Sequence, residues 1–237
     1  MQRLATNARS TDRFRIGTWR GDEHIALLSP KPGSVPTPQG ISRALEEVRR
    51  RGYATVLTPA LAATEQHPFE TAGFELQERL YLLRHDLAGP RTGAATTTTI
   101  RRGRRRDLDA ALAIDSLAFE PFWRLTPEAL TEARMATPRS RFRVLTDGAV
   151  LGYHVTGFAE STGYLQRLAV HPDQFGRGHG TALVNDALRW CERHRCSQLY
   201  VNTQETNRRA LDLYLRLGFV LEPQGLAVLR RELRSMA

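Results

Sequence analysis

The chain has 237 residues, of which 41% are hydrophobic and 25% charged, so its composition is that of a soluble globular protein with one large domain or two small ones. No run approaches the roughly 18 to 20 apolar residues of a membrane span, and the N-terminus lacks a signal-peptide core, so we expect a cytoplasmic protein without a membrane partner. Two cysteines are too few for a secreted disulfide framework, and the seven histidines show no zinc-like spacing with them, so we expect no metal.

The first part of the chain, residues 1–89, predicts a small α/β domain. A β-prone segment stops at Pro30, a turn covers residues 31–40, and residues 41–51 are helix-prone. Three prolines stand in that turn: Pro32, Pro36 and Pro38. Because each proline removes a backbone N–H donor, we expect this turn to be unable to hold an anion with its main chain.

A short segment, residues 90–97, predicts a linker because it is small, polar and aperiodic. The second domain, residues 98–237, begins with a strand and the basic run Arg101-Arg-Gly-Arg-Arg-Arg106. With a net charge of +9, this run raises nucleic-acid binding as an alternative function. No aromatic residue interrupts the run to stack bases, so we do not expect nucleic acid as a partner.

The second domain shows an alternation of strands and helices. We expect strands at about 98–102, 141–146, 150–158, 163–171, 198–203, 219–222 and 226–233, and helices at about 107–118, 126–136, 181–195 and 207–217. This order predicts an α/β fold with a mixed, twisted sheet and helices on both faces.

The most informative segment runs from Leu165 to Leu183. Its apolar, β-prone part stops at Pro172, glycines follow at 176, 178 and 180, and a helix-prone stretch comes next. A strand, a glycine-rich turn and a helix start leave several N–H groups unpaired at the positive end of the helix dipole, which predicts a phosphate site. The glycine spacing differs from both the G-x-x-x-x-G-K-[ST] loop and the G-x-G-x-x-G fingerprint.

A second pattern lies downstream, where Asn207, Ala210 and Tyr214 follow each other at i, i+3 and i+7 and Gly218-Phe219 comes next. One helix would place the first three along one face. In order along the chain, the two segments resemble motifs of the GCN5-related N-acetyltransferases (GNAT superfamily). These motifs are Arg/Gln-x-x-Gly-x-Gly/Ala, at the end of that family's fourth strand, and Asn-x-x-Ala-x-x-x-Tyr-x-x-x-Gly-Phe.

The resemblance implies the acyl-CoA N-acyltransferase fold and transfer of an acetyl group from acetyl-CoA to a primary amine. It also implies a set of positions that bind coenzyme A: Leu168, Ala169, Val170, Phe175, Gly176, Arg177, Gly178, His179, Gly180, Thr181, Asn207 and Tyr214. Phe175 departs from the pattern, because the family usually has Arg or Gln there. Since the loop acts mainly through main-chain donors, this departure weakens the match without removing it.

The N-terminal half-domain, residues 1–89, resembles a truncated and degenerate copy of the same fold. Phe74 matches Phe219 at a shift of 145 residues, which is the difference between their numbers. The same shift sets Phe69 opposite Tyr214, so the hydroxyl is missing. We therefore expect this half to be non-catalytic and to pack as a structural partner, with a substrate-binding module as the alternative.

For the chemistry, the resemblance makes Tyr214 the candidate general acid that protonates the leaving thiolate. The reference pKa of a tyrosine, about 10, lies above that of a thiol, about 8.5, so the hydroxyl keeps its proton at neutral pH. The alternatives are a tyrosine packed in the core, a helix-capping role for Asn207, and a solvated side chain for His179.

The general base is harder to find from the sequence. Relatives often carry a glutamate on the substrate-facing side of the fourth strand, where alternation puts Thr162, Tyr164 and Gln166 in this chain. None of these is a carboxylate. The remaining candidates are Glu120, which we include in the catalytic set, Glu160 and His154.

A weak base favours an acceptor amine of low pKa, such as an N-terminal α-amine. The segment Ala118-Phe-Glu-Pro-Phe-Trp123 also resembles the substrate-side loop of the ribosomal-protein alanine acetyltransferases. A protein N-terminus is therefore one candidate acceptor, and a small-molecule amine such as an aminoglycoside or amino sugar is the other. A non-catalytic acyl-CoA-binding protein stays open as a third hypothesis, and we expect a monomer or a homodimer.

Overall fold

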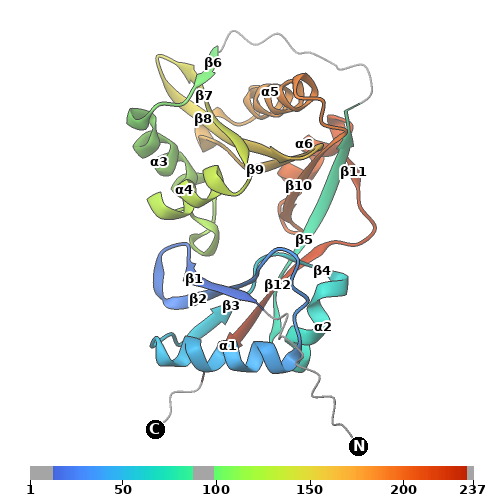
Figure 1. The fold of residues 1–237 in the computed structure, drawn as a ribbon. Coiled ribbons are helices and arrows are strands. Elements are labelled where there is room, and N and C mark those ends of the chain that lie inside the picture. Colours follow the sequence, from blue (N-terminus) through green and yellow to red (C-terminus); the bar gives the residue numbers. More distant parts are fainter. Residues whose placement is uncertain (1–12, 88–98, 234–237) are drawn as a thin grey trace, which may run out of the picture. The chain divides into compact units, whose positions relative to one another are not determined.

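The computed structural model describes residues 13–87 and 99–233 (Figure 1). The expected linker at 90–97 lies outside the described residues. The chain divides into two compact units, one made of residues 1–80 with 224–237 and the other of residues 81–223. None of the helices in the described ranges is both long enough and apolar enough to cross a membrane.

The first unit has strands from both ends of the chain. Its elements are β1 (Phe14–Trp19), β2 (Asp22–Pro30), α1 (Pro38–Arg50), β3 (Thr55–Leu57), β4 (Leu61–Ala62), α2 (Ala63–Thr71), the first part of β5 (Glu75–Asp86) and β12 (Leu226–Glu232). The strand order is β1-β2-β3-β12-β5, with β4 paired to β12. The β2–β3 pair is parallel, whereas β12 runs antiparallel to both of its neighbours.

Helix α1 packs on this sheet through a narrow apolar stripe. Ile41, Leu45 and Val48 recur at helical spacing and are almost wholly buried. At its start the Thr37 hydroxyl accepts a hydrogen bond from the amide of Gly40 at 3.1 Å. This N-cap pairs one of the amides that a helix leaves open at its start. Pro38 has no N–H, so the number of open amides is lower by one more.

The second unit has the alternating elements expected from the sequence. They are β6 (Thr99–Arg102), α3 (Leu108–Ala118), α4 (Pro127–Met135), β7 (Arg139–Asp147), β8 (Ala149–Ala159), β9 (Thr162–Val170), α5 (His179–Arg193), β10 (Gln198–Gln204), α6 (Arg208–Arg216) and β11 (Val220–Leu221), with the end of β5. The strand order is β5-β10-β9-β8-β7-β6.

Helices cover both faces of this sheet, as alternation along the strands requires. On one face, Ala111 and Ile114 of α3 and Leu130 of α4 pack with Val144 and Val155 of the strands. A different cluster joins α5 and α6 to the strands on the other face, with Val184, Leu188, Leu199, Leu211 and Tyr214 among its members. The predicted mixed α/β sheet with helices on both faces is confirmed.

Helices α2 and α6 end in the same way, at positions that the shift of 145 residues relates. Each is followed by a glycine with positive φ and then a phenylalanine. The amide of Phe74 donates to the carbonyl of Phe69 at 3.0 Å, and the amide of Phe219 donates to the carbonyl of Tyr214 at 3.1 Å. The aromatic rings in both pairs have centroids 5.4 Å apart.

The compact units divide the chain differently from the boundary drawn from sequence, which gave residues 1–89 and 98–237. Strand β12 is red in Figure 1 and lies among the blue and cyan elements of the first unit. Residues 81–86 of β5 belong to the second unit, where Arg84 pairs with Val220 of β11. Strand β12 was predicted at about 226–233, but pattern alone does not specify the pairing partner of a strand.

The position of β12 yields a stability prediction. Leu229 is almost wholly buried in the core of the first unit, although it lies near the C-terminus of the chain. We expect Leu229→Ala to lower the free energy of unfolding of that unit by about 2–5 kcal/mol. Urea unfolding followed by the fluorescence of Trp19, with Trp123 and Trp190 replaced by Phe, would measure this.

The matched control is Leu221→Ala in β11, because Leu221 is 42% exposed. An unchanged Trp19 transition in Leu229→Ala would contradict the assignment of β12 to the first unit.

Candidate active site

The glycine-rich segment between β9 and α5 is a compact turn. After Val170, residues Pro172–Gln174 form one turn of 3-10 helix, and the amide of Phe175 donates to the carbonyl of Pro172 at 3.0 Å. Gly176 and Gly178 then take positive φ angles of 76° and 79°. Helix α5 begins at His179, two residues before the predicted start, because the left-handed Gly178 is its N-cap.

The amides of this turn form a set of open donors. The first helical hydrogen bond of α5 runs from the amide of Ala182 to the carbonyl of Gly178 at 2.9 Å. In the part of the chain that the structure describes, the amides of residues 176–181 donate no hydrogen bond. Gly178 provides no side-chain cap, so these donors stay open at the positive end of the helix dipole. Such an arrangement binds anions, and phosphates in particular.

The glycines of the turn have two different roles. A Cβ at Gly176 or Gly178 would meet nothing within 4 Å, so these positions need glycine for their positive φ. A Cβ at Gly180 would lie 3.0 Å from Cδ2 of Leu213, so this glycine lets α5 pack closely against α6.

Two side chains around the turn differ from the sequence-based expectations. Phe175 is 37% exposed, and the guanidinium of Arg209 lies 3.9 Å from its ring centroid. Its amide is already paired with Pro172, so the donor set begins at Gly176. His179 is only 7% exposed and not solvated. Its pKa is lowered mainly by burial and, to a smaller extent, by the charge of Arg177.

Strand β9 opens away from β10 beside this turn. Their parallel pairing covers Thr162 to Tyr164 of β9 and stops there. On the edge that faces β8, the amide of His171 donates to the carbonyl of Leu151 at 2.8 Å. In an antiparallel ladder every second residue points its backbone groups at the neighbouring strand, and the residues between them point away from it. Leu168 and Val170 therefore direct their backbone N–H and C=O groups toward the open side, as the predicted cofactor arm requires.

A β-bulge in β9 places a residue that the sequence did not single out. The register with β8 shifts so that Val155 faces Arg167 while Thr156 faces Leu165. Because Gln166 is the extra residue, strict alternation fails and Arg167 reaches the face covered by α3. The sequence signal that could have indicated a buried cation partner is Asp115, a carboxylate within an apolar stretch of α3.

Asp115 is wholly buried and carries four hydrogen bonds. Nε and Nη2 of Arg167 donate to its two oxygens, both at 2.7 Å, the Tyr153 hydroxyl donates at 2.5 Å, and the amide of Leu125 donates at 2.8 Å. Arg167 also donates to the carbonyl of Trp123 at 2.7 Å. The pair thus joins strand β9 to the loop between α3 and α4.

Tyr214 lies on α6 and is 5% exposed, with its ring in the core beside Phe219. Its hydroxyl has no hydrogen-bond partner among the described residues. Burial raises the pKa of this phenol and the charge of Arg167 lowers it, with a net rise, so Tyr214 is protonated at neutral pH. It is therefore both a packed side chain and a proton donor without a partner.

Asn207 is the N-cap of α6, where its Oδ1 accepts from the amide of Ala210 at 3.1 Å. The expected capping alternative is therefore present. Its side-chain NH₂ donates to no described residue, so one donor stays open beside the same helix start.

The three candidate bases lie in different environments. Glu120 is exposed and precedes the short 3-10 turn Pro121–Trp123, and Glu160 is exposed in the turn between β8 and β9. His154 is wholly buried and faces α5. No described hydrogen bond or ion pair joins any of them to Tyr214.

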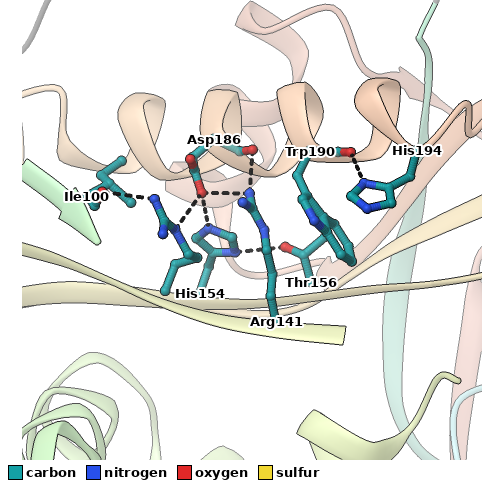
Figure 2. Close-up of polar contacts among 8 residues, drawn as sticks. Ile100, Arg141, His154, Thr156, Asp186, Trp190 and His194 are labelled. Carbon is teal, nitrogen blue, oxygen red and sulfur yellow. Dashed lines mark hydrogen bonds and ion pairs between the residues drawn. The ribbon is translucent and has the colours of Figure 1, made fainter. Parts of the chain in front are cut away.

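His154 belongs to a polar cluster beneath α5 (Figure 2). Asp186 of α5 accepts from Nη2 of Arg141 at 2.6 Å, Nε of Arg143 at 3.3 Å and Nε2 of His154 at 3.0 Å. Nδ1 of His154 lies 2.7 Å from the hydroxyl of Thr156. Although this set contains a hydroxyl, an imidazole and a carboxylate, His154 and Thr156 are wholly buried, so no substrate reaches them.

The cluster fixes the protonation states of its members. Burial acts to raise the pKa of Asp186, but the hydrogen bond from His154 and the charge of Arg141 lower it to about 2. Burial also lowers the pKa of His154, so its ring is neutral. An ionised Asp186 then holds α5 against β7 and β8, which fixes the helix whose first amides are open.

The basic run at the start of the second unit is partly paired. Arg101 of β6 forms a bidentate ion pair with the buried carboxylate of Asp107, at 2.7 and 2.8 Å. The amide of Arg104 donates to the same carboxylate at 2.7 Å. Arg101 thus secures the start of α3. The described residues contain no group of three or more His, Cys, Asp or Glu side chains placed to hold a metal ion.

The buried His154 yields a pH prediction. Because its pKa is lowered in the folded state, the unfolded chain binds more protons below about pH 6.5. The free energy of unfolding should therefore fall as the pH drops from 7 to 5, by up to about 1.4 kcal/mol per pH unit. Urea unfolding of His154→Gln at several pH values should give a shallower dependence than the wild type.

The same substitution at His194, which is exposed, is the matched control for loss of an imidazole. A dependence in His154→Gln as steep as that of the wild type would contradict a role for the buried ring.

Comparisons with known proteins agree with this geometry. Residues 108–219 match the model of the Acetyltransferase (GNAT) family. A GCN5-related N-acetyltransferase from Sphaerobacter thermophilus is 18% identical with a TM-score of 0.62, over 94% of this chain and 76% of that chain. A tandem GNAT protein from the clavulanic acid biosynthesis pathway is 15% identical with a TM-score of 0.66, over 94% and 79%.

The ribosomal-protein-S18-alanine N-acetyltransferase from Escherichia coli is also similar. It is 20% identical with a TM-score of 0.50, over 60% of this chain and 97% of that chain. At these identities the three structures establish the fold alone. The chain thus has the acyl-CoA N-acyltransferase fold, and its residues 108–219 match the model of the GNAT family.

Proposed function

We propose that this protein is an N-acetyltransferase that moves an acetyl group from acetyl-CoA to a primary amine. The observation that carries the proposal is the run of open amides from Gly176 to Thr181 at the start of α5. Hydrogen bonds to charged groups contribute about 1.5–3 kcal/mol each, so several of these donors would anchor a pyrophosphate without a dedicated lysine.

The remaining contacts of coenzyme A follow from the same region. The backbone groups of Leu168 and Val170 on the open side of β9 would hold the pantetheine arm. The free NH₂ of Asn207 and the charge of Arg177 would add to the binding. Acetyl-CoA supplies the activated acetyl thioester when bound, and a free N–H on β9 would polarise its carbonyl.

Tyr214 is the general acid of this proposal. As the acceptor nitrogen bonds to the acetyl carbon and the C–S bond breaks, the hydroxyl of Tyr214 gives its proton to the departing thiolate. The acceptor nitrogen loses a proton to water or to Glu120, which is exposed on the loop between α3 and α4. The raised pKa keeps the hydroxyl of Tyr214 protonated at neutral pH, so the proton is present when the thiolate departs.

The acceptor is an amine of low pKa in this proposal. Tyr214 marks the reacting centre, and none of the candidate bases contacts it, so the amine must lose its proton without a strong base beside it. Deprotonating a lysine amine, with a pKa of about 10.4, costs roughly 4.6 kcal/mol at pH 7, whereas an α-amine of pKa about 7.7–8.0 costs about 1 kcal/mol. A protein N-terminus fits this limit. An aminoglycoside or amino sugar is the alternative acceptor, and an acyl-CoA-binding protein without turnover is the alternative function.

The N-terminal half has no part in the chemistry under this proposal. Thr37 caps α1 at the place where α5 leaves its amides open. Phe69 stands where the shift of 145 residues would put the hydroxyl of Tyr214. Residues 1–89 are therefore proposed as a degenerate, non-catalytic half of a tandem GNAT protein, with catalysis in residues 98–237.

The open turn yields a binding prediction. An alanine at Gly178 must adopt a φ of 79°, which costs about 1–2 kcal/mol and disturbs the donor set. We expect Gly178→Ala to weaken acetyl-CoA binding about tenfold in isothermal titration calorimetry. Gly148→Ala is the matched control, because Gly148 has a φ of 73°, similar open space and a place in another turn. Equal affinities in the two variants would contradict a phosphate role for the turn.

The acid role yields a kinetic prediction. Tyr214→Phe should lower kcat about a hundredfold or more, because general acid catalysis contributes about 10²–10⁴-fold, while acetyl-CoA affinity changes little. Thiol release with a panel of amines and peptides measures the first, and calorimetry measures the second. Tyr81→Phe, beside the same core cluster, is the control. Full turnover in Tyr214→Phe would remove this tyrosine from the mechanism.

A further inference from the structure

Arg167 offers a binding nitrogen that the transfer chemistry does not use. Its side chain is about nine-tenths buried, at 10% exposure, and its guanidinium is fixed by Asp115 and by the carbonyl of Trp123. The ring of Phe119 lies 3.5 Å from its central carbon. These contacts use Nε and Nη2. Nη1 donates to no described residue, and it is not one of the buried side-chain nitrogens that lack a partner, so it is not completely shielded from solvent.

The position of Arg167 relates this nitrogen to the reacting groups. It sits on β9 next to Leu168, where the strand has already parted from β10. The charge of Arg167 lowers the pKa of Tyr214, although burial gives a net rise. Arg167 also anchors the loop that carries Glu120. Arg167 thus lies where the open strand and this loop are joined, and Nη1 is its open donor.

We propose that Nη1 of Arg167 binds a carbonyl or carboxylate oxygen on the carbon that follows the amine-bearing carbon of the acceptor, so that the acceptor is an α-aminoacyl group. This inference rests on the proposed acetyl transfer and narrows its substrate class. A guanidinium N–H pairs most strongly with a carbonyl or carboxylate oxygen, whereas an amino sugar offers hydroxyls. The shared chemistry has two sources: a peptide N-terminus, with an amide carbonyl, and a free amino acid, with a carboxylate.

The charge of Arg167 agrees with this acceptor class. A fixed cation disfavours a protonated amine beside it, so it selects the neutral nucleophile. An α-amine next to a carbonyl has a low pKa of about 7.7–8.0 and loses its proton readily. One residue thus provides both recognition of the acyl oxygen and preference for the reactive form of the amine.

The first test uses the wild-type protein and three acceptors. We expect kcat/KM for alaninamide to exceed, by about ten- to a hundredfold, that of a fluorinated ethylamine of equal amine pKa that lacks oxygen. Free alanine is the third acceptor, and preference for it over alaninamide assigns the carboxylate source. Equal kcat/KM for alaninamide and the oxygen-free amine would overturn the inference and leave acetyl transfer intact. No thiol release with any amine would overturn the proposed function and this inference with it.

The second test replaces the guanidinium. Arg167→Lys keeps a cation but loses the planar fork, so KM for alaninamide should rise about tenfold or more while KM for the oxygen-free amine stays nearly constant. Calorimetry with acetyl-CoA verifies that the variant is folded, and Arg124→Lys, on the same loop and exposed, is the matched control. An unchanged preference in Arg167→Lys would overturn the assignment. If this variant fails to bind acetyl-CoA, the wild-type comparison decides.

Discussion

A helix cannot pair its own first amides, and the second unit makes use of this constraint. At α1 a threonine hydroxyl and a proline reduce the open donors, whereas at α5 the cap is a glycine and the donors of residues 176–181 stay free. Exposed amides are solvated, so leaving them open costs little until a ligand replaces the water. The positive φ of Gly176 and Gly178 keeps the turn in the one shape that gathers these donors.

Two buried carboxylates hold the elements around this turn, one on each face of the sheet. Asp186 fixes α5 through Arg141, Arg143 and His154. On the other face, Asp115 fixes β9 and the loop before α4 through Arg167. Removing one partner from a buried ion pair leaves an uncompensated charge, so such pairs tolerate little displacement. The open strand and the open helix start are therefore held by polar contacts as well as by apolar packing.

The sequence predicted the elements of the second unit to within a few residues, and it located the glycine turn, because these features are local. The position of β12 in the first unit was not predicted, because strands of similar apolarity cannot be assigned to pairing partners from their sequence. The bulge at Gln166 was also missed, because alternation assumes a regular ladder, and Arg167 was overlooked with it. His154 was kept as a candidate base because its burial beneath α5 depends on the tertiary structure and cannot be predicted from the sequence.

The central claim is that the main chain from Gly176 to Thr181 binds the pyrophosphate of coenzyme A. Amide chemical shifts of the isotopically labelled protein, recorded with coenzyme A and then with pantetheine, test it directly, because pantetheine lacks the pyrophosphate. We predict large shifts of the Gly176, Gly178 and Gly180 amides with coenzyme A and small ones with pantetheine. If both ligands shift these amides equally, or neither does, the claim is wrong.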